Sequence, residues 1–320
     1  MTQTDNAILD LNPPLSSLKE EVLMGLSQTQ KQLHPKLFYD KKGSGLFNQI
    51  TTLPEYYLTR AEKEVLASVH DDIGSFIGST ATLIELGCGS EEKIKLILKS
   101  LQRGNRYIPI DISREALNNT VEKLLVSYPL LDVKAIRADY TQALSFLCHG
   151  LEERKVILFL GSTIGNFDEN ERDRFLHQLA KNLNPNDGLL IGIDLKKSPR
   201  LLEAAYNDSK GITAAFNKNL LHRINRELDG NFQMEQFTHH AFFNHVKNRI
   251  EMHLISETAQ EVSIGDETFS FLPGETIHTE NSYKFDLKEF QQILVKIGLC
   301  LRKVWTDKHN YFAVTYIEPL

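Results

Sequence analysis

A glycine-rich, acidic loop follows the first apolar run of strand length. The run ATLIELG (81–87) passes into Gly87-Cys-Gly89-Ser, and Glu85 lies just before the loop. Glycines let a ligand approach the backbone closely, and a helix that starts next offers free N–H groups. A dinucleotide fingerprint requires a third glycine where this chain has Glu92, an acid poorly placed beside a pyrophosphate. The acidic loop therefore favours S-adenosylmethionine, which carries a positive sulfonium and an amine and has no phosphate.

Two further acids end the next two predicted strands. RYIPID (106–111) ends at Asp111, and VKAIRAD (133–139) ends at Asp139, which Tyr140 follows. In an open α/β sheet, ligands bind beyond the carboxyl ends of the strands. We expect Asp111 to accept the ribose hydroxyls, and Asp139 and Tyr140 to meet the adenine. Both acids could instead cap the helices that follow, but acids on three successive strands favour the ligand.

Strand-length apolar runs alternate with helical patterns over residues 81–194. Several runs, such as KVILFLGS (155–162) and GLLIGID (188–194), are apolar on both faces, as a sheet covered on both sides requires. Such alternation predicts parallel strands with right-handed crossovers. LRKVWTD (301–307) and YFAVTYIE (311–318) are separated by three residues and predict an antiparallel hairpin. We therefore expect a doubly wound, mostly parallel, seven-stranded Rossmann-like α/β sheet with a terminal antiparallel hairpin, which resembles methyltransferases of this fold.

The strand–helix alternation is interrupted after the fifth strand. Residues 198–230 read as helical, and residues 233–283 read as strands and turns without an obvious sheet. We expect residues 60–197 and 284–320 to form an S-adenosylmethionine-binding domain. Residues 1–59 and 198–283 are expected to form a second, α+β substrate-binding domain. Within it, the stretch 38–62 has three tyrosines and a Gly-x-Gly turn, does not read as core, and is expected to help form the substrate pocket.

Composition excludes several classes of protein. The chain has 320 residues, 41% hydrophobic and 24% charged, which suits a packed globular protein. A net charge of −6 disfavours a nucleic-acid or anionic-membrane binder. Three cysteines lie far apart, without metal-ligand spacing: Cys88, Cys148 and Cys300. No signal peptide or membrane-length apolar run occurs. We expect a cytoplasmic monomer without a metal, a nucleic-acid partner or a membrane partner.

Several long blocks of the sequence, in order, resemble the histidine-specific Nα-methyltransferases of ergothioneine biosynthesis. They are residues 38–62, ELGCGSEEK (85–93), FLGSTIGNF (159–167), AAYNDSKGITAAFNKNLLHRINREL (204–228) and TENS…KF (279–285). The resemblance runs from about residue 35 to the end of the chain. It implies an S-adenosylmethionine-dependent enzyme that trimethylates the α-amine of L-histidine to give hercynine. A related fungal branch methylates other amines, including a prenylated tryptophan, so the family alone leaves the substrate open.

The resemblance also implies a role for each matched residue. Those that hold S-adenosylmethionine are Gly87, Lys93, Asp111, Asp139 and Tyr140. The amine and carboxylate of the amino acid are held by Tyr56, Asn166 and Tyr206. Phe216 and Met252 line the pocket, and Glu280 and Ser282 hydrogen-bond the imidazole. Tyr39 lies near the amine and is the candidate catalytic residue.

The chemistry of Glu280 and Ser282 favours histidine over tryptophan. A neutral imidazole has one donor and one acceptor nitrogen, which a carboxylate and a hydroxyl can serve. Residues 280 and 282 of an extended segment share one face. No cluster of His, Cys and acidic residues suggests a metal, and His239, His240 and His253 fit no ligand spacing. Two alternatives remain: a methyltransferase of the same fold for another small amine, and a non-catalytic protein that binds S-adenosylmethionine.

Overall fold

The computed structural model describes residues 8–11, 18–101, 105–139 and 153–320. The chain divides into two compact units. Unit 1 comprises Met1–Pro14, Ala61–Leu195 and Phe285–Leu320, and unit 2 comprises Leu15–Arg60 and Lys196–Lys284. Among the described residues, no helix has both the length and the apolar character needed to cross a membrane.

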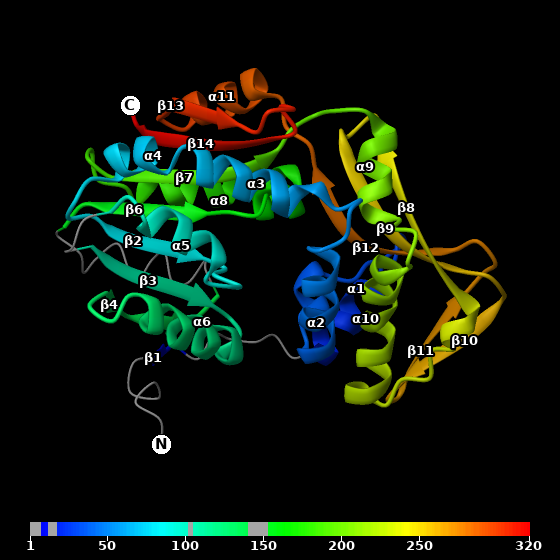
Figure 1. Ribbon diagram of the computed structural model, residues 1–320. Helices are drawn as coiled ribbons and strands as arrows, with labels where there is room; N and C mark the ends of the chain where they lie inside the picture. Colours follow the sequence, from blue (N-terminus) through cyan, green and yellow to red (C-terminus); the bar gives the residue numbers. More distant parts are fainter. Residues whose placement is uncertain (1–7, 12–17, 102–104, 140–152) are drawn as a thin grey trace. The chain divides into compact units, whose positions relative to one another are not determined.

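Unit 1 is built on one large sheet (Figure 1). Within the described residues it has nine strands, in the order β1-β5-β3-β2-β6-β7-β14-β13, with β4 pairing with β3. Their bounds are β1 Ile8–Asp10, β2 Thr82–Leu86, β3 Arg106–Asp111, β4 Asp132–Val133, β5 Ala135–Arg137, β6 Lys155–Phe159, β7 Gly188–Asp194, β13 Leu299–Thr306 and β14 Phe312–Pro319. Strands β1 to β7 pair in parallel, and β14 runs antiparallel to β7 and β13. The predicted fold class and hairpin are confirmed, and the short strands β1 and β4 widen the predicted seven-stranded sheet.

The N-terminal strand β1 belongs to the sheet of unit 1. Ile8–Asp10 pairs in parallel with Ala135–Arg137, and the Arg137 guanidinium donates to Asp10 at 3.0 Å. The sequence had placed these residues with the substrate-binding domain, and for residues 8–10 that prediction was wrong. The cause is a three-residue strand that adds to a sheet edge, too short to leave a periodic pattern in the sequence.

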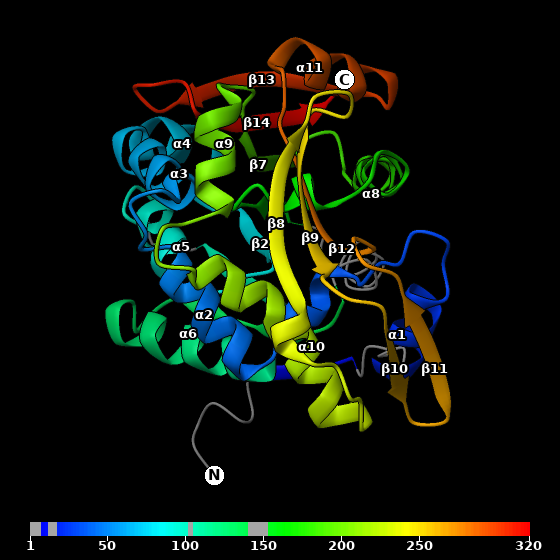
Figure 2. The same cartoon turned by 90° about the vertical axis from the view of Figure 1, so that its right-hand side faces the viewer.

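Helices cover both faces of the sheet of unit 1. Figures 1 and 2 show α4 (His70–Ile77), α5 (Glu92–Leu98) and α6 (Arg114–Ser127) on one face and α8 (Glu169–Lys181) on the other. The central strands β2, β6 and β7 are buried along their whole length, as a doubly covered sheet requires. Helix α8 begins with a capping box of Asp168 and Glu171, and α11 (Leu287–Lys296) begins with the capping side chain of Asp286.

Unit 2 has its own helices and its own sheets (Figure 2). The helices are α1 (Leu18–Leu26), α2 (Lys41–Ile50), α9 (Pro199–Tyr206) and α10 (Ile212–Leu228), and α3 (Tyr57–Ser68) begins in unit 2 and continues into unit 1. Strands β8 (Phe237–Asn244), β9 (Arg249–Ser256) and β12 (Thr276–Tyr283) form an antiparallel sheet, and β10 (Gln260–Ile264) and β11 (Glu267–Phe271) form a hairpin. Helix α10 packs on α2, β8 and β9. The strands predicted over 233–283 therefore do form a sheet, which the sequence pattern had not revealed.

Residues 38–60 of the stretch 38–62 contribute to the core of unit 2. Phe38 is fully buried and stacks on Phe216 of α10, with ring centroids 4.4 Å apart. Leu53, Tyr56 and Tyr57 are also buried. The expectation that this stretch is not core was wrong, because its aromatic side chains turn inward against α10 and α9.

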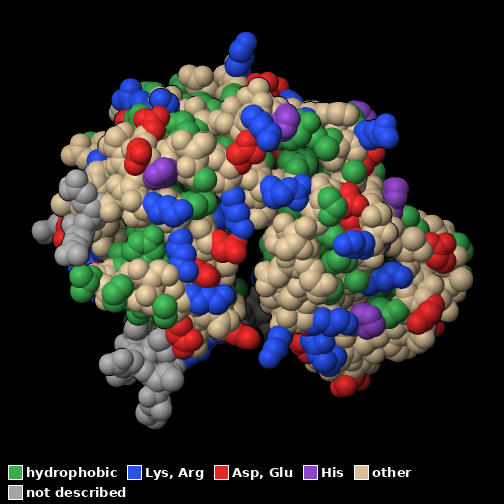
Figure 3. Space-filling view, viewed as in Figure 1, with side chains coloured by type: hydrophobic (Ala, Val, Ile, Leu, Met, Phe, Trp, Pro, Cys, Tyr) green, Lys and Arg blue, Asp and Glu red, His purple; other side chains and the backbone are tan. Residues whose placement is uncertain are grey.

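Charged side chains of both signs are interspersed over the face of the molecule drawn in Figure 3. This distribution accords with the net charge of −6. The absence of a nucleic-acid partner stays a prediction.

Candidate functional site

The loop after β2 keeps its backbone open to a ligand. Gly87 and Gly89 have φ angles of 72° and 51°, in the left-handed region that favours glycine. A Cβ atom added at either position would meet no atom of the residues that the structure describes within 4 Å. The Gly87 N–H donates to the Ile110 carbonyl at 2.8 Å, which anchors the loop to the end of β3. The sheet order reverses between β2 and β6, so the loop lies at the switch point where such folds bind ligands.

Asp111 ties the ends of β2 and β3 together. Its carboxylate accepts from the Ser113 N–H at 2.9 Å and from the Gly89 N–H at 3.4 Å. Burial raises the pKa of this carboxyl. The side chain that caps α6 is Ser113, which accepts from the Ala116 N–H at 3.2 Å, so Asp111 is not the capping residue of that helix. Asp139 lies two residues beyond the end of β5 at the same edge. Tyr140 lies outside the described residues.

A buried carboxylate that the sequence analysis missed holds Lys93. The Lys93 ammonium lies 2.6 Å from Glu62 Oε2, and Glu62 Oε1 accepts from the Gly161 N–H at 2.6 Å. The Glu62 side chain is 1% exposed. Glu62 thus links α5 to the loop that follows β6. Its signal in the sequence was an acid at the end of the block 38–62, in an otherwise helical pattern.

Glu85 does not add charge to the glycine loop, contrary to expectation. It lies inside β2, is 2% exposed and accepts from the Tyr107 hydroxyl at 2.5 Å. Burial raises the pKa of Glu85 to about 7, although the Tyr107 hydrogen bond opposes the rise. Glu85 was one of three acids predicted to face the cofactor. In the structure its side chain instead links β2 to β3 through the hydrogen bond with Tyr107.

One aromatic cluster in unit 2 contains four of the predicted substrate-binding and catalytic residues. Phe47 of α2 contacts Tyr39, Tyr56 and Phe216, with centroid distances of 5.7, 6.3 and 6.0 Å. Tyr56 in turn contacts Tyr206 at 6.1 Å. Phe47, at the centre of this cluster, was missed by the sequence analysis; its only signal was a large aromatic on the amphipathic helix that follows Tyr39.

The predicted substrate-binding residues are divided between the two units. Asn166 ends a short 3₁₀ helix, Thr163–Asn166, in unit 1, whereas Tyr56 and Tyr206 belong to unit 2. The residue that caps α8 is Asp168, so Asn166 does not have the capping role that its place after Gly165 could suggest.

A bulge in β12 directs Glu280 and Ser282 to one face of the sheet. The pairing of β12 with β9 shifts between His278 and Glu280, so that Glu280 lies opposite Met252 and Ser282 opposite Ile250. Thr279, at the bulge, donates its hydroxyl hydrogen to the Met252 carbonyl at 3.0 Å. Paired residues of an antiparallel sheet share a face. Glu280, Ser282 and Met252 therefore project together, as their predicted roles require.

Glu280 is held in a state that favours a hydrogen-bonding ligand. The residue as a whole is half-buried. Burial of its carboxyl raises the pKa of Glu280 to about 7, and the positive charge of Lys284 opposes this rise. Within the described residues, its carboxylate makes no hydrogen bond. Ser282 is buried, and its Oγ lies 2.7 Å from the Tyr206 hydroxyl and 2.7 Å from the Lys284 ammonium. Lys284 was missed by the sequence analysis, although it continues the alternation of residues 280 and 282.

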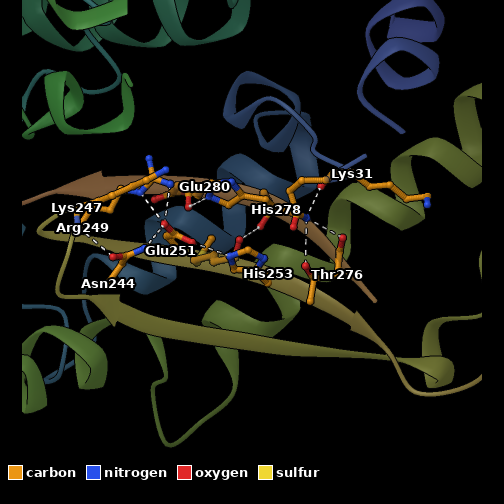
Figure 4. Close-up of polar contacts among 12 residues, drawn as sticks. Lys31, Asn244, Lys247, Arg249, Glu251, His253, Thr276, His278 and Glu280 are labelled. Atoms are coloured by element: carbon orange, nitrogen blue, oxygen red, sulfur yellow. Dashed lines mark hydrogen bonds and ion pairs between the residues drawn. The ribbon is translucent and has the colours of Figure 1, made fainter. Parts of the chain in front are cut away.

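The opposite face of β9 and β12 carries a hydrogen-bonded histidine cluster (Figure 4). Glu251, His253 and His278 offer ligand atoms within 4.8 Å of one another, so the expectation that no such cluster exists was wrong. Arg249 already pairs with Glu251 at 2.6 Å, and His253 Nε2 lies 3.1 Å from the second carboxylate oxygen. The two imidazole rings stack, with centroids 4.6 Å apart and planes 10° apart, so one ion cannot lie in both ring planes.

The histidine cluster contacts the backbone of the β12 bulge from the face of the sheet opposite to the Glu280 side chain. His278 Nε2 donates to the backbone carbonyl of Glu280 at 3.1 Å. Burial and the neighbouring His253 lower the pKa of His278 to about 4, so its ring is neutral near pH 7. Burial alone would raise the pKa of Glu251, but the hydrogen bonds from His253 and Arg249 lower it well below its usual range. The arrangement therefore fixes the backbone of Glu280.

Comparison with known proteins shows the family to which the chain belongs. A model of the S-adenosylmethionine-dependent, histidine-specific methyltransferases matches residues 18–319. The chain belongs to this family. It is an S-adenosylmethionine-dependent methyltransferase, and the predicted fold and enzyme class agree with that membership.

Curated relatives support the assignment over most of the chain. The chain is 40% identical to the histidine N-alpha-methyltransferase of Mycobacterium tuberculosis over 304 residues, covering 93% of this chain and 94% of the relative. It is 30% identical to ergothioneine biosynthesis protein 1 of Neurospora crassa, covering 88% of this chain and 32% of the relative. A 4-dimethylallyltryptophan N-methyltransferase of Claviceps purpurea is 26% identical, covering 91% of this chain and 92% of the relative.

Proposed function

We propose that this methyltransferase transfers three methyl groups in turn from S-adenosylmethionine to the α-amine of L-histidine. The product would be hercynine, and the reaction would be the first step of ergothioneine biosynthesis. Membership of the histidine-specific family supports this proposal, as does 40% identity to a histidine N-alpha-methyltransferase. The structural observation that carries the proposal is the pair of Glu280 and Ser282 on one face of β12.

The pair suits the two nitrogens of a neutral imidazole. The Glu280 carboxylate accepts from the ring N–H, and the Ser282 hydroxyl serves the other nitrogen. An indole would leave the hydroxyl without an acceptor nitrogen, at a cost of about 1–3 kcal/mol for an unmet buried polar group. Met252, opposite Glu280, and Phe216 in the aromatic cluster would supply apolar contacts for the ring.

The donor is proposed to bind at the carboxyl edge of the sheet of unit 1. The open backbone at Gly87 would accommodate it, Asp111 and Asp139 would accept its hydroxyl and amino groups, and Lys93 would be positioned by Glu62. Tyr140 keeps its predicted role beside the adenine. S-adenosylmethionine supplies an electrophilic methyl and leaves as a neutral thioether, so no acid catalyst is needed.

The chain's own task in the reaction is to orient a neutral amine. Tyr56, Asn166 and Tyr206 would hold the amine and carboxylate of histidine, and Tyr39 would direct the amine lone pair toward the methyl. Tyr39 is 42% exposed and packs edge-on against Phe47 and Phe216, which limits its ring orientation. Proton loss to water must precede each attack on an amine that is still protonated. Alignment of the two reacting atoms would supply most of the rate.

The unit that carries each set of residues suggests a division of labour. We infer that unit 1 binds the donor and that unit 2 recognises the amino acid, with Asn166 as the contribution of unit 1 to amino-acid binding. A cytoplasmic monomer that acts on a small molecule, without a metal, a nucleic acid or a membrane, completes the proposal.

Release of S-adenosylhomocysteine tests the proposal. With limiting L-histidine and excess donor, we expect three equivalents of S-adenosylhomocysteine for each histidine consumed. L-Tryptophan and its prenylated derivative serve as the competing substrates, because a relative of this chain is named for the latter. Turnover of either in preference to histidine would favour the alternative of another amine, and donor binding without turnover of any amine would favour a non-catalytic role.

A further inference from the structure

Lys284 is a buried cation directly beside the proposed imidazole-binding pair. Its residue is 3% exposed, and its ammonium lies 2.7 Å from Ser282 Oγ and 3.3 Å from the Tyr206 hydroxyl oxygen. The ammonium also lies 5.0 Å from the centre of the Tyr206 ring. Lys284 directly follows β12, the strand that carries Glu280 and Ser282, and Figure 4 shows Glu280 on that strand. This geometry places the Lys284 ammonium within hydrogen-bonding distance of the hydroxyl that is proposed to meet the imidazole.

The contacts of Ser282 determine whether its hydroxyl can donate a hydrogen bond to a ligand or accept one from it. An ammonium has three donors and no acceptor, so Lys284 can only donate to Ser282 Oγ. Tyr206 also donates to Ser282 Oγ at 2.7 Å, as the more acidic phenol should when it meets an aliphatic hydroxyl. A serine hydroxyl has two lone pairs and one hydrogen. Both lone pairs are therefore occupied, and the hydrogen alone is left for a ligand.

That hydrogen has no acceptor within the described part of the chain. Among the described residues, Ser282 Oγ contacts Tyr206 and Lys284, and both of them donate to it. Glu280, two residues earlier on the same face, presents a carboxylate that makes no hydrogen bond among the described residues. The strand thus presents one acceptor and one forced donor side by side.

We propose that Lys284 is a specificity-determining positioning residue, which together with Tyr206 fixes the Ser282 hydroxyl as a donor to the substrate. The inference rests on the proposed function and deepens it, because it specifies the form of the substrate ring. Glu280 takes an N–H, and Ser282 gives a hydrogen to a bare ring nitrogen. The pair therefore selects a neutral azole with one N–H and one lone pair. An imidazolium or an indole offers no lone pair to Ser282.

Two analogues of histidine separate the two halves of this recognition. The pyrrolyl analogue keeps the ring N–H and lacks the acceptor nitrogen, so it tests the Ser282 side. The thiazolyl analogue keeps an acceptor nitrogen and lacks the N–H, so it tests the Glu280 side. The measured quantity is kcat/KM for each analogue relative to histidine, determined from S-adenosylhomocysteine release by the full chain.

Lys284→Met should weaken only one of these two preferences. The preference for histidine over the pyrrolyl analogue should fall by about fivefold, the worth of one ordinary hydrogen bond. The preference for histidine over the thiazolyl analogue should stay within about twofold. General damage to the fold would instead lower activity on all substrates together. Lys288→Met, at an exposed position, is the matched control and should leave both ratios unchanged.

Two further variants keep the test decisive if Lys284→Met folds poorly. Lys284→Gln retains an N–H donor without the charge, and it should preserve the histidine-to-pyrrolyl ratio that Lys284→Met loses. Ser282→Ala should lower the same ratio, and adding Lys284→Met to Ser282→Ala should lower it no further, because the two act through one hydroxyl.

An unchanged histidine-to-pyrrolyl ratio in Lys284→Met, or additive effects in the double variant, would overturn the role of Lys284. Either result leaves histidine turnover by the parent protein intact, so the proposed function would survive it. Failure of the parent to methylate histidine would instead refute the proposed function, and this inference with it.

Discussion

Replacing Glu280 with glutamine should stabilise the ligand-free protein above neutral pH. Burial raises the pKa of this carboxyl to about 7, against a usual value of 4.5. The folded state therefore binds the proton more tightly than the unfolded state. The stability that the protonated group contributes is complete below pH 4.5 and is lost as the pH rises through 7. The gap between the two pKa values corresponds to a loss of about 3 kcal/mol as an upper limit.

Glu280→Gln removes this titration and keeps the shape of the side chain. Between pH 5 and pH 8, the free energy of unfolding of the parent should fall relative to that of the variant by about 1–3 kcal/mol. The assay is urea unfolding followed by circular dichroism, without histidine. Circular dichroism is preferred to fluorescence because the single tryptophan, Trp305, lies in unit 1, whereas Glu280 lies in unit 2. Glu257→Gln, at an exposed position of unit 2, is the matched control.

The same substitution should impair catalysis with histidine. Hydrogen bonds to charged groups contribute about 1.5–3 kcal/mol, so kcat/KM for histidine should fall by roughly 10- to 150-fold in Glu280→Gln. If Glu280→Gln raises the stability of the protein and lowers its activity, the Glu280 carboxylate serves ligand binding at a cost in stability. An identical pH dependence of stability in parent and variant would refute the burial argument, and unchanged histidine kinetics would refute the role of Glu280 in recognition.

Three other predictions concern the scaffold and the donor site. Asp187→Asn should destabilise the protein by about 3–5 kcal/mol in urea unfolding, because Asp187 pairs with Lys155 at 3.0 Å and both side chains are 1% exposed. The control is Arg302→Gln, in an exposed pair with Glu318, which should lower the free energy of unfolding by less than about 1 kcal/mol. Equal effects of the two substitutions would contradict this reasoning. Asp111→Ala should weaken binding of S-adenosylmethionine by at least about tenfold in calorimetry, as lost charged hydrogen bonds imply, while Asp132→Asn should not. Chelators should leave the rate unchanged, and a loss of activity that added metal restores would assign a role to Glu251, His253 and His278.

The large sheet could be predicted from the sequence because its signals are local. Residues 82–86, 155–159 and 188–194 are short apolar runs, and each is buried on both faces in the structure. The positions of Asp111 and Asp139 at one edge of the sheet could be predicted in the same way, because the ends of parallel strands meet at one edge. Glu85 misled this reasoning, since a carboxyl inside a strand faces its neighbour Tyr107 rather than the loop.

The site in unit 2 depends on contacts that local patterns do not encode. Phe47 meets Phe216 across 169 positions of sequence, and Tyr206 meets Ser282 across 76. The bulge at Thr279 changes which residues share a face, so His278 and Glu280 serve opposite sides although two positions separate them. The alternation of 280 and 282 survived because the bulge precedes both residues. A resemblance to a family could name these residues, whereas only the folded chain shows Glu62, Phe47 and Lys284 beside them.

Competition among amino acids tests the central claim most directly. The purified protein is incubated with methyl-deuterated S-adenosylmethionine and an equimolar mixture of the twenty amino acids, and the products are identified by mass spectrometry. A histidine product that carries three labelled methyl groups, with no label on the other amino acids, is the predicted result. Label on a different amino acid, with histidine unmodified, would contradict the account.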